Sequence, residues 1–238
     1  MITAAILEMA DVLGASLAPL FAEVSDWRDR LEAVLSAGGA SSTDVDEAVE
    51  WLVAPSLADA RPTLGAGFVA APGFLEDAPW HLAWWASAAN GVGLGGRPGT
   101  LRRLVSIEDP LDESFHDYTR LEWWRGAVEG RGAYLAGPYI DYLCTDELTL
   151  TLTMPVEVDG RVAGVVGADL SVARLERLTD GVIGAAAVPA VLGTAAGRVI
   201  AATDAGVEPG TPARRLGWAC EWHPVPGCGG TLAVSRAA

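Results

Sequence analysis

The segment from Tyr118 to Leu175 constrains the fold most, because it orders a helix, a turn, a strand pair and a second helix within one short stretch. Helix formers surround two adjacent tryptophans in YTRLEWWRGAVEG, and a glycine ends that stretch. In the strand pair, DELTLTLTMPVEV alternates polar and apolar residues, DGR makes a tight turn, and VAGVVGADL is an apolar, β-branched run that ends at Asp169. Ser171 is the expected N-cap of the following helix, SVARLERLTDG.

The rest of the chain places helices before strands. Apolar residues recur at helical spacing through about Ala37 and again from Asp44 to Pro55. From Leu64 onward, short apolar runs are bounded by Gly, Pro and Asn, and alternating βαβ units are absent. This order predicts an α+β fold, with an N-terminal helical layer over residues 1–62 and one mostly antiparallel sheet domain over residues 63–238.

The N-terminal helix is apolar enough to raise the question of a signal peptide or membrane span. Glu8, Asp11 and Glu23 interrupt the apolar run, and no basic residue precedes it, so we expect no membrane insertion and a cytoplasmic location. Apolar residues recur at helical spacing along this stretch, at Ile6, Met9, Leu13, Leu17 and Leu20. This spacing predicts an amphipathic helix that either covers a sheet or pairs with its copy in a homodimer.

The charge balance argues against nucleic acid as a partner. The chain has 16 basic residues, all Arg, against 31 acidic ones, which gives a net charge of −15. Such a surface repels phosphate backbones and anionic lipid. We therefore expect a soluble protein that binds neither nucleic acid nor a membrane surface.

Three motifs in the central segment are similar, in order and spacing, to those of the Cache family of sensor domains. They are W-W-R-x-A, G-P-Y-x-D and T-x-x-x-P-V-x-x-x-G-R-x-x-G-V-V-G-A-D-L-S. The resemblance implies a PAS-like antiparallel sheet behind a long N-terminal helix, here in a free-standing, single-Cache form. It also implies a sensor function, in which a small polar metabolite binds between sheet and helical insert and the signal passes to an unidentified partner protein.

Seven residues are candidates for ligand contact. Adjacent helix positions point about 100° apart, so Trp123 and Trp124 cannot face the same wall, and one is expected to pack while the other lines a cavity. Tyr139 and Asp141 either shape a turn after Pro138 or border the pocket, and the resemblance implies the second role for Tyr139. The full set is Trp85, Tyr118, Trp123, Trp124, Tyr139, Asp141 and Asp169.

Asp169 is the sharpest candidate, because a carboxylate at the end of an apolar strand is costly to bury without a partner. A helix cap, or a salt bridge to Arg125 or Arg174, would also explain it. The resemblance implies instead that it receives a ligand ammonium group. It also implies an arginine carboxylate clamp where this chain has Leu121, which favours an amine or neutral polar ligand, with cation–π faces from the tryptophans, Trp84 included.

Enzymatic chemistry has weaker support. His116 and its acidic neighbours could form an acid–base cluster, but a solvated loop explains them more simply, so we expect no enzyme. Gly91, Gly93 and Gly96 match G-x-G-x-x-G, but Arg97-Pro98-Gly99 cannot open the helix that a dinucleotide site requires. A small-molecule enzyme and a Cache-fold regulatory protein without a ligand remain the alternatives.

The three cysteines predict neither a metal site nor a required disulfide. Cys220 and Cys228 could bridge, or could bind zinc together with His223, but that set is one ligand short. Free thiols are the expectation in a reducing cytosol. We therefore predict no metal and no cofactor.

Overall fold

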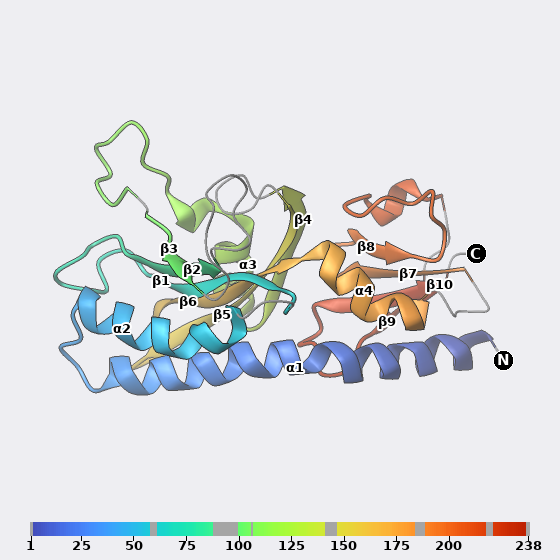
Figure 1. Cartoon of the computed structure of the whole chain (residues 1–238), viewed down its shortest axis with the longest axis horizontal. Coiled ribbons are helices and arrows are strands. Elements are labelled where there is room, and N and C mark those ends of the chain that lie inside the picture. The colour runs from blue at the N-terminus through green and yellow to red at the C-terminus, as the bar shows by residue number, and fades with distance from the viewer. Residues whose placement is uncertain are drawn as a thin grey trace.

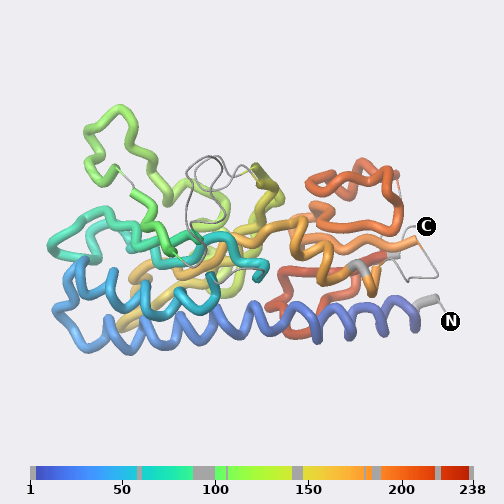
Figure 2. Tube along the Cα trace, viewed as in Figure 1, coloured from blue at the N-terminus to red at the C-terminus, as the bar shows by residue number. Residues whose placement is uncertain are grey.

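A computed structural model describes residues 2–57, 61–87, 100–105, 107–140, 147–183, 189–217 and 221–236. Helix α1 (Ile2–Ser36) runs below two sheets along the length of the molecule (Figure 1). Figure 2 shows the same arrangement as a continuous trace, with α2 (Ser42–Val53) folded back along the second half of α1. Ser41 and Asp44 form a capping box that starts α2.

The larger sheet has six antiparallel strands in the order β3-β2-β1-β6-β5-β4. Helices α1 and α2 cover one face, and α3 (Glu122–Gly130) covers the other. The 3-10 turns η1 (Ala54–Leu57) and η3 (Tyr118–Arg120) precede β1 and α3. The strands are β1 (Thr63–Ala70), β2 (Leu82–Ser87), β3 (Leu101–Arg103), β4 (Tyr134–Ile140), β5 (Leu148–Val158) and β6 (Arg161–Ser171).

The smaller sheet has four antiparallel strands in the order β8-β7-β10-β9. Helix α4 (Val172–Ile183) follows β6 without a loop and leads the chain to this sheet. The first half of α1 and helix α4 pack against it (Figure 1). Its elements are β7 (Ala190–Thr194), β8 (Val199–Ala202), the 3-10 turn η4 (Ala213–Arg215), β9 (Trp222–Pro224) and β10 (Leu232–Arg236).

The predicted α+β class, the long N-terminal helix and the helical insert are confirmed. One difference concerns the sheet, which we expected to be single over residues 63–238. The 12-residue helix α4 rises about 18 Å, enough to carry the chain past the larger sheet. The later strands pair with one another, so they form a sheet of their own.

The apolar stripe of α1 is buried within its own chain, so of its two predicted roles the structure confirms the first, a helix that covers a sheet, and the stripe is not a dimer surface. Gly14 lies so close to the β9–β10 turn that a Cβ there would be 2.7 Å from the carbonyl oxygen of Pro226. By length and composition alone α1 could cross a membrane, yet its stripe lies against the two sheets. The stripe residues, each at most 9% exposed, are Ile6, Met9, Leu13, Leu17 and Leu20.

Candidate functional site

Strand β5 separates apolar and polar side chains onto the two faces of the larger sheet. Leu150, Leu152 and Met154 join the core formed with α1. The alternate residues are threonines, and Thr153 donates a hydrogen bond of 2.7 Å from its Oγ1 to the carbonyl oxygen of Trp123 in α3. Because side chains alternate along a strand, the threonine face is the face beneath α3.

Three residues from adjacent strands form a polar cluster on this face: Tyr139, Thr151 and Asp169. Thr151 of β5 lies opposite Asp169 of β6, and its Oγ1 donates a hydrogen bond of 2.7 Å to Asp169 Oδ1. The hydroxyl of Tyr139, from β4, contacts the Thr151 hydroxyl. Asp169 is only 6% exposed. The sheet therefore holds a buried carboxylate in a fixed orientation.

A glycine opens the space beside this carboxylate. Gly65 of β1 is paired with Asp169. A Cβ at Gly65 would lie 2.7 Å from the indole Nε1 of Trp84 and 3.4 Å from Asp169 Oδ2. The missing side chain thus allows an indole N–H donor and the carboxylate to border the same space.

Aromatic rings from β2, η3 and α3 make a buried layer next to the polar cluster. Trp84, Tyr118 and Trp124 pack in one hydrophobic cluster, with the Tyr118 and Trp124 ring centroids 5.3 Å apart. The Tyr118 hydroxyl donates a hydrogen bond of 2.7 Å to the carbonyl oxygen of Ala70, and burial raises the pKa of this phenol to about 12. Tyr118 is therefore a neutral, anchored part of the layer.

Helix α3 orients its two tryptophans differently. Trp124 is buried in the aromatic layer, whereas Trp123 is half-buried, and their ring planes are inclined by 70°. Gly126 allows close packing, since a Cβ there would lie 2.3 Å from the ring of Tyr134. Leu121 precedes the helix as its N-cap residue and is 45% exposed.

The structure does not bring all seven sequence candidates together. Trp85 lies on the opposite face from Asp169, in the core shared with α1 and α2, where the guanidinium of Arg103 lies 5.9 Å from its ring centroid. Its neighbour Trp84 borders the carboxylate instead. Asp141 lies outside the described residues. Thr151 and Gly65 were missed, although the alternating threonines of β5 do mark a polar face.

Three contacts bear on the alternative roles predicted for Asp169, a helix cap or a salt bridge to Arg125 or Arg174. Ser171 is the residue at the start of α4 whose Oγ accepts from the amide of Arg174, at 3.4 Å. Arg125 forms an exposed ion pair with Glu129 at 3.1 Å. Arg174 donates to the carbonyl oxygen of Arg61 at 2.6 Å. The residue that caps α4 is therefore Ser171.

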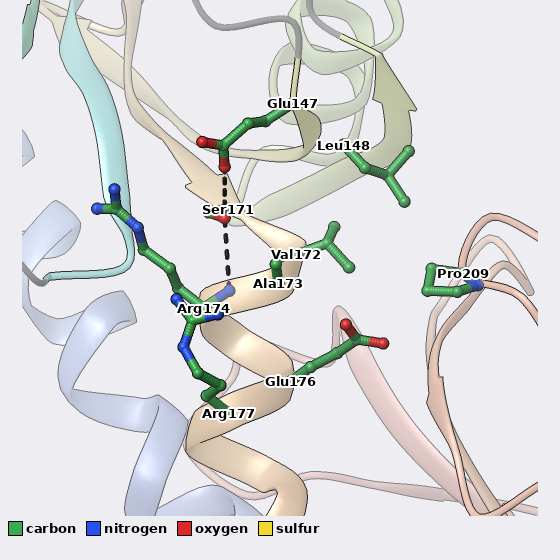
Figure 3. Close-up of a pocket in the computed structure, with 9 residues that line it drawn as sticks. All are labelled: Glu147, Leu148, Ser171, Val172, Ala173, Arg174, Glu176, Arg177 and Pro209. Carbon is green, nitrogen blue, oxygen red and sulfur yellow. Dashed lines mark hydrogen bonds between the residues drawn. The ribbon is translucent and has the colours of Figure 1, made fainter. Parts of the chain in front are cut away.

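A separate cavity of about 410 Å³ lies at the start of α4, between the two sheets (Figure 3). Ser171 donates to Glu147 Oε2 at 2.8 Å on one side of it, and Glu176 and Pro209 border another side. Residues of both charges line it, and the polar cluster lies elsewhere.

The residues that the sequence offered for catalysis and metal binding lie away from the polar cluster. His116 is exposed, and its Nδ1 lies 2.7 Å from the carbonyl oxygen of Ser114. In the described part of the chain, no group of three His, Cys, Asp or Glu residues could hold a metal ion. Cys228 is a buried free thiol whose pKa is raised to about 12 by burial, and Cys220 lies outside the described residues.

A protein-family model matches the part of the chain that contains the polar cluster. Residues 105–177 match the family model described as methyl-accepting chemotaxis protein-like, first PDC sensor domain. This stretch contains η3, α3, β4, β5, β6 and the start of α4, and therefore all three residues of the polar cluster.

Solved structures resemble the whole chain at low sequence identity. The ligand-binding domain of the Pseudomonas aeruginosa PAO1 amino-acid chemoreceptor PctC with GABA is 17% identical, with a TM-score of 0.57 and coverage of 98% of this chain and 97% of that one. The PctB domain from the same organism with L-Arg is 15% identical, with a TM-score of 0.60 and coverage of 99% and 93%.

A third similar structure is the ligand-binding domain of the Pseudomonas fluorescens chemoreceptor CtaA with L-valine. It is 14% identical, with a TM-score of 0.62, and the alignment covers 100% of this chain and 95% of that one. With its long helix, two sheets and matching central segment, the chain has the fold of the Cache, or PDC, ligand-binding domains of chemoreceptors.

Proposed function

We propose that this chain is the ligand-binding domain of a sensor and that it recognises a small amine or amino-acid-like molecule through Asp169. The observation that carries the proposal is the polar cluster, which keeps a nearly buried carboxylate beneath the aromatic layer of α3. A buried charge is retained where a partner or a function compensates its desolvation. The similar structures in complex with GABA, L-Arg and L-valine support a ligand of this class.

The direction of the hydrogen bonds supports a ligand that donates. A carboxylate only accepts, so the single hydroxyl proton of Thr151 goes to Asp169. The contact between Tyr139 and Thr151 then uses the phenol proton of Tyr139. Both Tyr139 and Asp169 therefore present acceptor oxygens, which suit the several N–H donors of an ammonium group.

Signal transduction without catalysis is part of the same proposal. The similar proteins are sensor domains of chemoreceptors, which supports a non-enzymatic role. We propose that another domain or protein reads the occupied state. A homodimer would need a surface other than the buried α1 stripe, and the expected cytoplasmic location stays a prediction.

Calorimetric titration with amines, amino acids and organic acids tests this function. We expect the wild-type protein to bind an amine or amino acid, and Asp169→Asn to bind it about ten- to a hundredfold more weakly, because a charge-assisted hydrogen bond contributes roughly 1.5–3 kcal/mol. Thr151→Val should weaken binding less, because the carboxylate remains but loses its orienting donor. The matched control is Asp26→Asn, on the exposed face of α1, where Asp26 pairs only with Arg30 among the ion pairs of the described chain.

Two results would contradict the proposal. One is a folded wild-type protein that binds no amine or amino acid in the panel. The other is an Asp169→Asn variant that keeps wild-type affinity. Melting curves of each variant distinguish a lost contact from a lost fold.

A further inference from the structure

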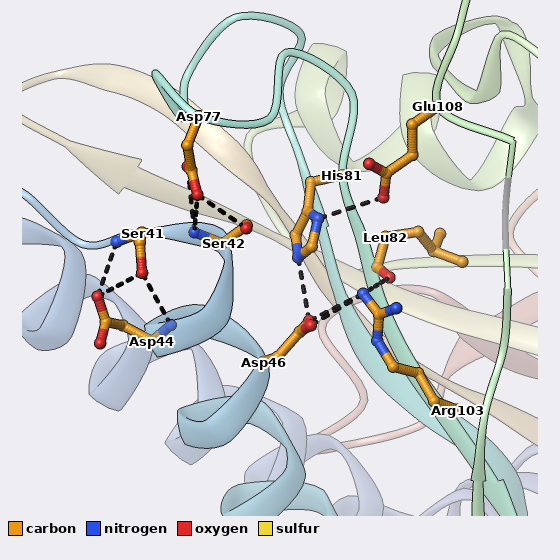
Figure 4. A network of polar contacts seen from close by, with 9 residues as sticks. All are labelled: Ser41, Ser42, Asp44, Asp46, Asp77, His81, Leu82, Arg103 and Glu108. Carbon is orange, nitrogen blue, oxygen red and sulfur yellow. Dashed lines mark hydrogen bonds and ion pairs between the residues drawn. The ribbon is translucent and has the colours of Figure 1, made fainter.

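A buried histidine lies between two carboxylates on the helical side of the larger sheet (Figure 4). His81, directly before β2, is 3% exposed. Its Nε2 lies 3.0 Å from Asp46 Oδ1 of α2, and its Nδ1 lies 3.3 Å from Glu108 Oε1, in the connection between β3 and η3. One imidazole thus joins two segments that are 62 residues apart in sequence, as their residue numbers show.

The Asp46 side of this arrangement has a second, permanent cation. Arg103 of β3 places its Nη2 2.9 Å from Asp46 Oδ2 and also donates to the carbonyl oxygen of Leu82 at 3.2 Å. Because a guanidinium stays charged at every physiological pH, α2 remains tied to β3 whatever the charge of His81.

The interaction with Glu108 depends on how many protons the His81 ring carries. Asp46 and Glu108 both only accept, so a neutral His81, which has one ring proton, can donate to only one of them. The shorter contact, 3.0 Å from Nε2 to Asp46 against 3.3 Å from Nδ1 to Glu108, favours the proton on Nε2 and leaves the Nδ1 lone pair facing Glu108. Nδ1 is buried and makes no hydrogen bond within the described part of the chain. Only the doubly protonated ring donates toward both carboxylates.

The charged groups around His81 come from four segments. Asp46, Glu108 and Asp77 are negative, and Asp77, in the β1–β2 connection, is also held by hydrogen bonds from Ser42. Arg103 is the one positive neighbour among the ion pairs described here. Tyr118, which lies near Glu108, stays neutral because burial raises its pKa to about 12.

We propose that His81 is a proton-operated clamp on the connection between β3 and η3. The charged ring ties Glu108 to α2, and the neutral ring releases it. This connection leads directly to Tyr118, which packs against Trp124 in the aromatic layer, so the clamp controls the segment that enters the candidate site. The clamp itself does not depend on the proposed function.

Hydrogen exchange followed by mass spectrometry tests the clamp on the whole chain. Peptides that cover residues 107–117 are compared at one pH below and one pH above the midpoint that NMR titration of the His81 ring gives, after correction for intrinsic exchange rates. We expect about two- to fivefold more protection at the lower pH, the size of a partly exposed ion pair. NMR titration of the His81 ring shows whether the change follows its protonation.

Two variants on the same connection make the test specific. Glu108→Gln removes the charge that the clamp needs and should abolish the pH dependence, and its side chain is 42% exposed, so the fold should tolerate it. Glu113→Gln is the matched control, because Glu113 is exposed, and it should behave like wild type. Equal protection at both pH values in wild type, or an unchanged pH dependence in Glu108→Gln, overturns the proposal.

Discussion

The two sheets share one helix but differ in what they bury. The larger sheet buries an imidazole and a carboxylate, those of His81 and Asp169, together with the threonines of β5. In the smaller sheet, the polar side chains buried among the described residues are the hydroxyls of Thr194, Thr231 and Ser235, and the buried thiol of Cys228 is neutral. Buried ionisable groups cost far more free energy than hydroxyls that find a carbonyl partner.

This difference fits our proposals, in which the larger sheet recognises the ligand and the smaller sheet has a structural role. The larger sheet accepts an energetic cost at two places, and both places have a chemical role in our proposals. The smaller sheet follows the rules of an ordinary hydrophobic core, in which Leu192, Ile200 and Val234 pack with the first half of α1. One continuous cluster nevertheless includes residues of both sheets and of α1.

The largest expected effect tests whether the sheets fold together. Leu13→Ala, next to the smaller sheet, and Leu31→Ala, next to the larger one, each remove a buried side chain that is at most 1% exposed. Each should lower the free energy of unfolding by about 2–5 kcal/mol. Because one cluster spans both sheets, we expect a single transition in circular dichroism and in tryptophan fluorescence for both variants.

Leu7→Ala is the control for this comparison, because Leu7 lies on the same helix and is 49% exposed. It should change stability by less than either core variant. If Leu13→Ala produced two separate transitions, the smaller sheet would be an independent unit and the shared core would not be cooperative.

A smaller effect concerns the aromatic layer of the larger sheet. Tyr118→Phe removes the hydrogen bond to the carbonyl oxygen of Ala70 and should cost about 1–2 kcal/mol in urea unfolding. Burial raises the folded-state pKa of this phenol to about 12, so its contribution to stability is complete below about pH 10 and is lost as the pH rises toward 12. The alkaline loss of stability should therefore shrink in the variant.

Tyr134→Phe is the matched control, since the Tyr134 hydroxyl donates to the exposed carboxylate of Glu122. Its cost should be lower, because the carboxylate regains water when the phenol is removed. An equal cost for the two variants would mean that the buried carbonyl of Ala70 finds another donor.

The smallest effect is expected in the smaller sheet, where Cys228 should be inert. Burial raises the pKa of this thiol to about 12, so at about pH 8 it is neither ionised nor accessible. Peptide mapping after iodoacetamide treatment should find Cys228 unmodified in the native protein and modified in urea. Rapid native labelling would show that the smaller sheet opens more easily than its core suggests.

Local patterns predicted most elements of the central segment, but the Gly-Pro-Tyr stretch, expected as a turn, is part of strand β4. Residues close together in sequence specify the elements predicted correctly: the alternating polar and apolar residues of β5, the DGR turn, and the helix formers around Trp124. The structure has these elements where they were expected. The division into two sheets could not be predicted in the same way. It depends on which distant strand β7 pairs with, and no local pattern specifies that choice.

The neighbours of Asp169 depend on an irregularity that the sequence does not reveal. The β5–β6 register shifts by one residue between Val156 and Glu157. Without this bulge, Asp169 would lie opposite Leu150, whose side chain faces the other side of the sheet. The bulge therefore decides that Thr151 orients the carboxylate. The choice between Trp84 and Trp85 has a similar origin, since adjacent strand residues face opposite sides and only the register with β1 decides which one borders Asp169.

Strand β6 passes into helix α4 at Ser171, with no intervening loop. Asp169 and Ser171 are two positions apart on an extended strand, about 6.6 Å along its axis. Ser171 also bonds Glu147 and the first turn of α4, which rests on α1. Two peptide units therefore connect the position of Asp169 to the orientation of α4. The stiffness of this short backbone segment links the larger sheet to the smaller.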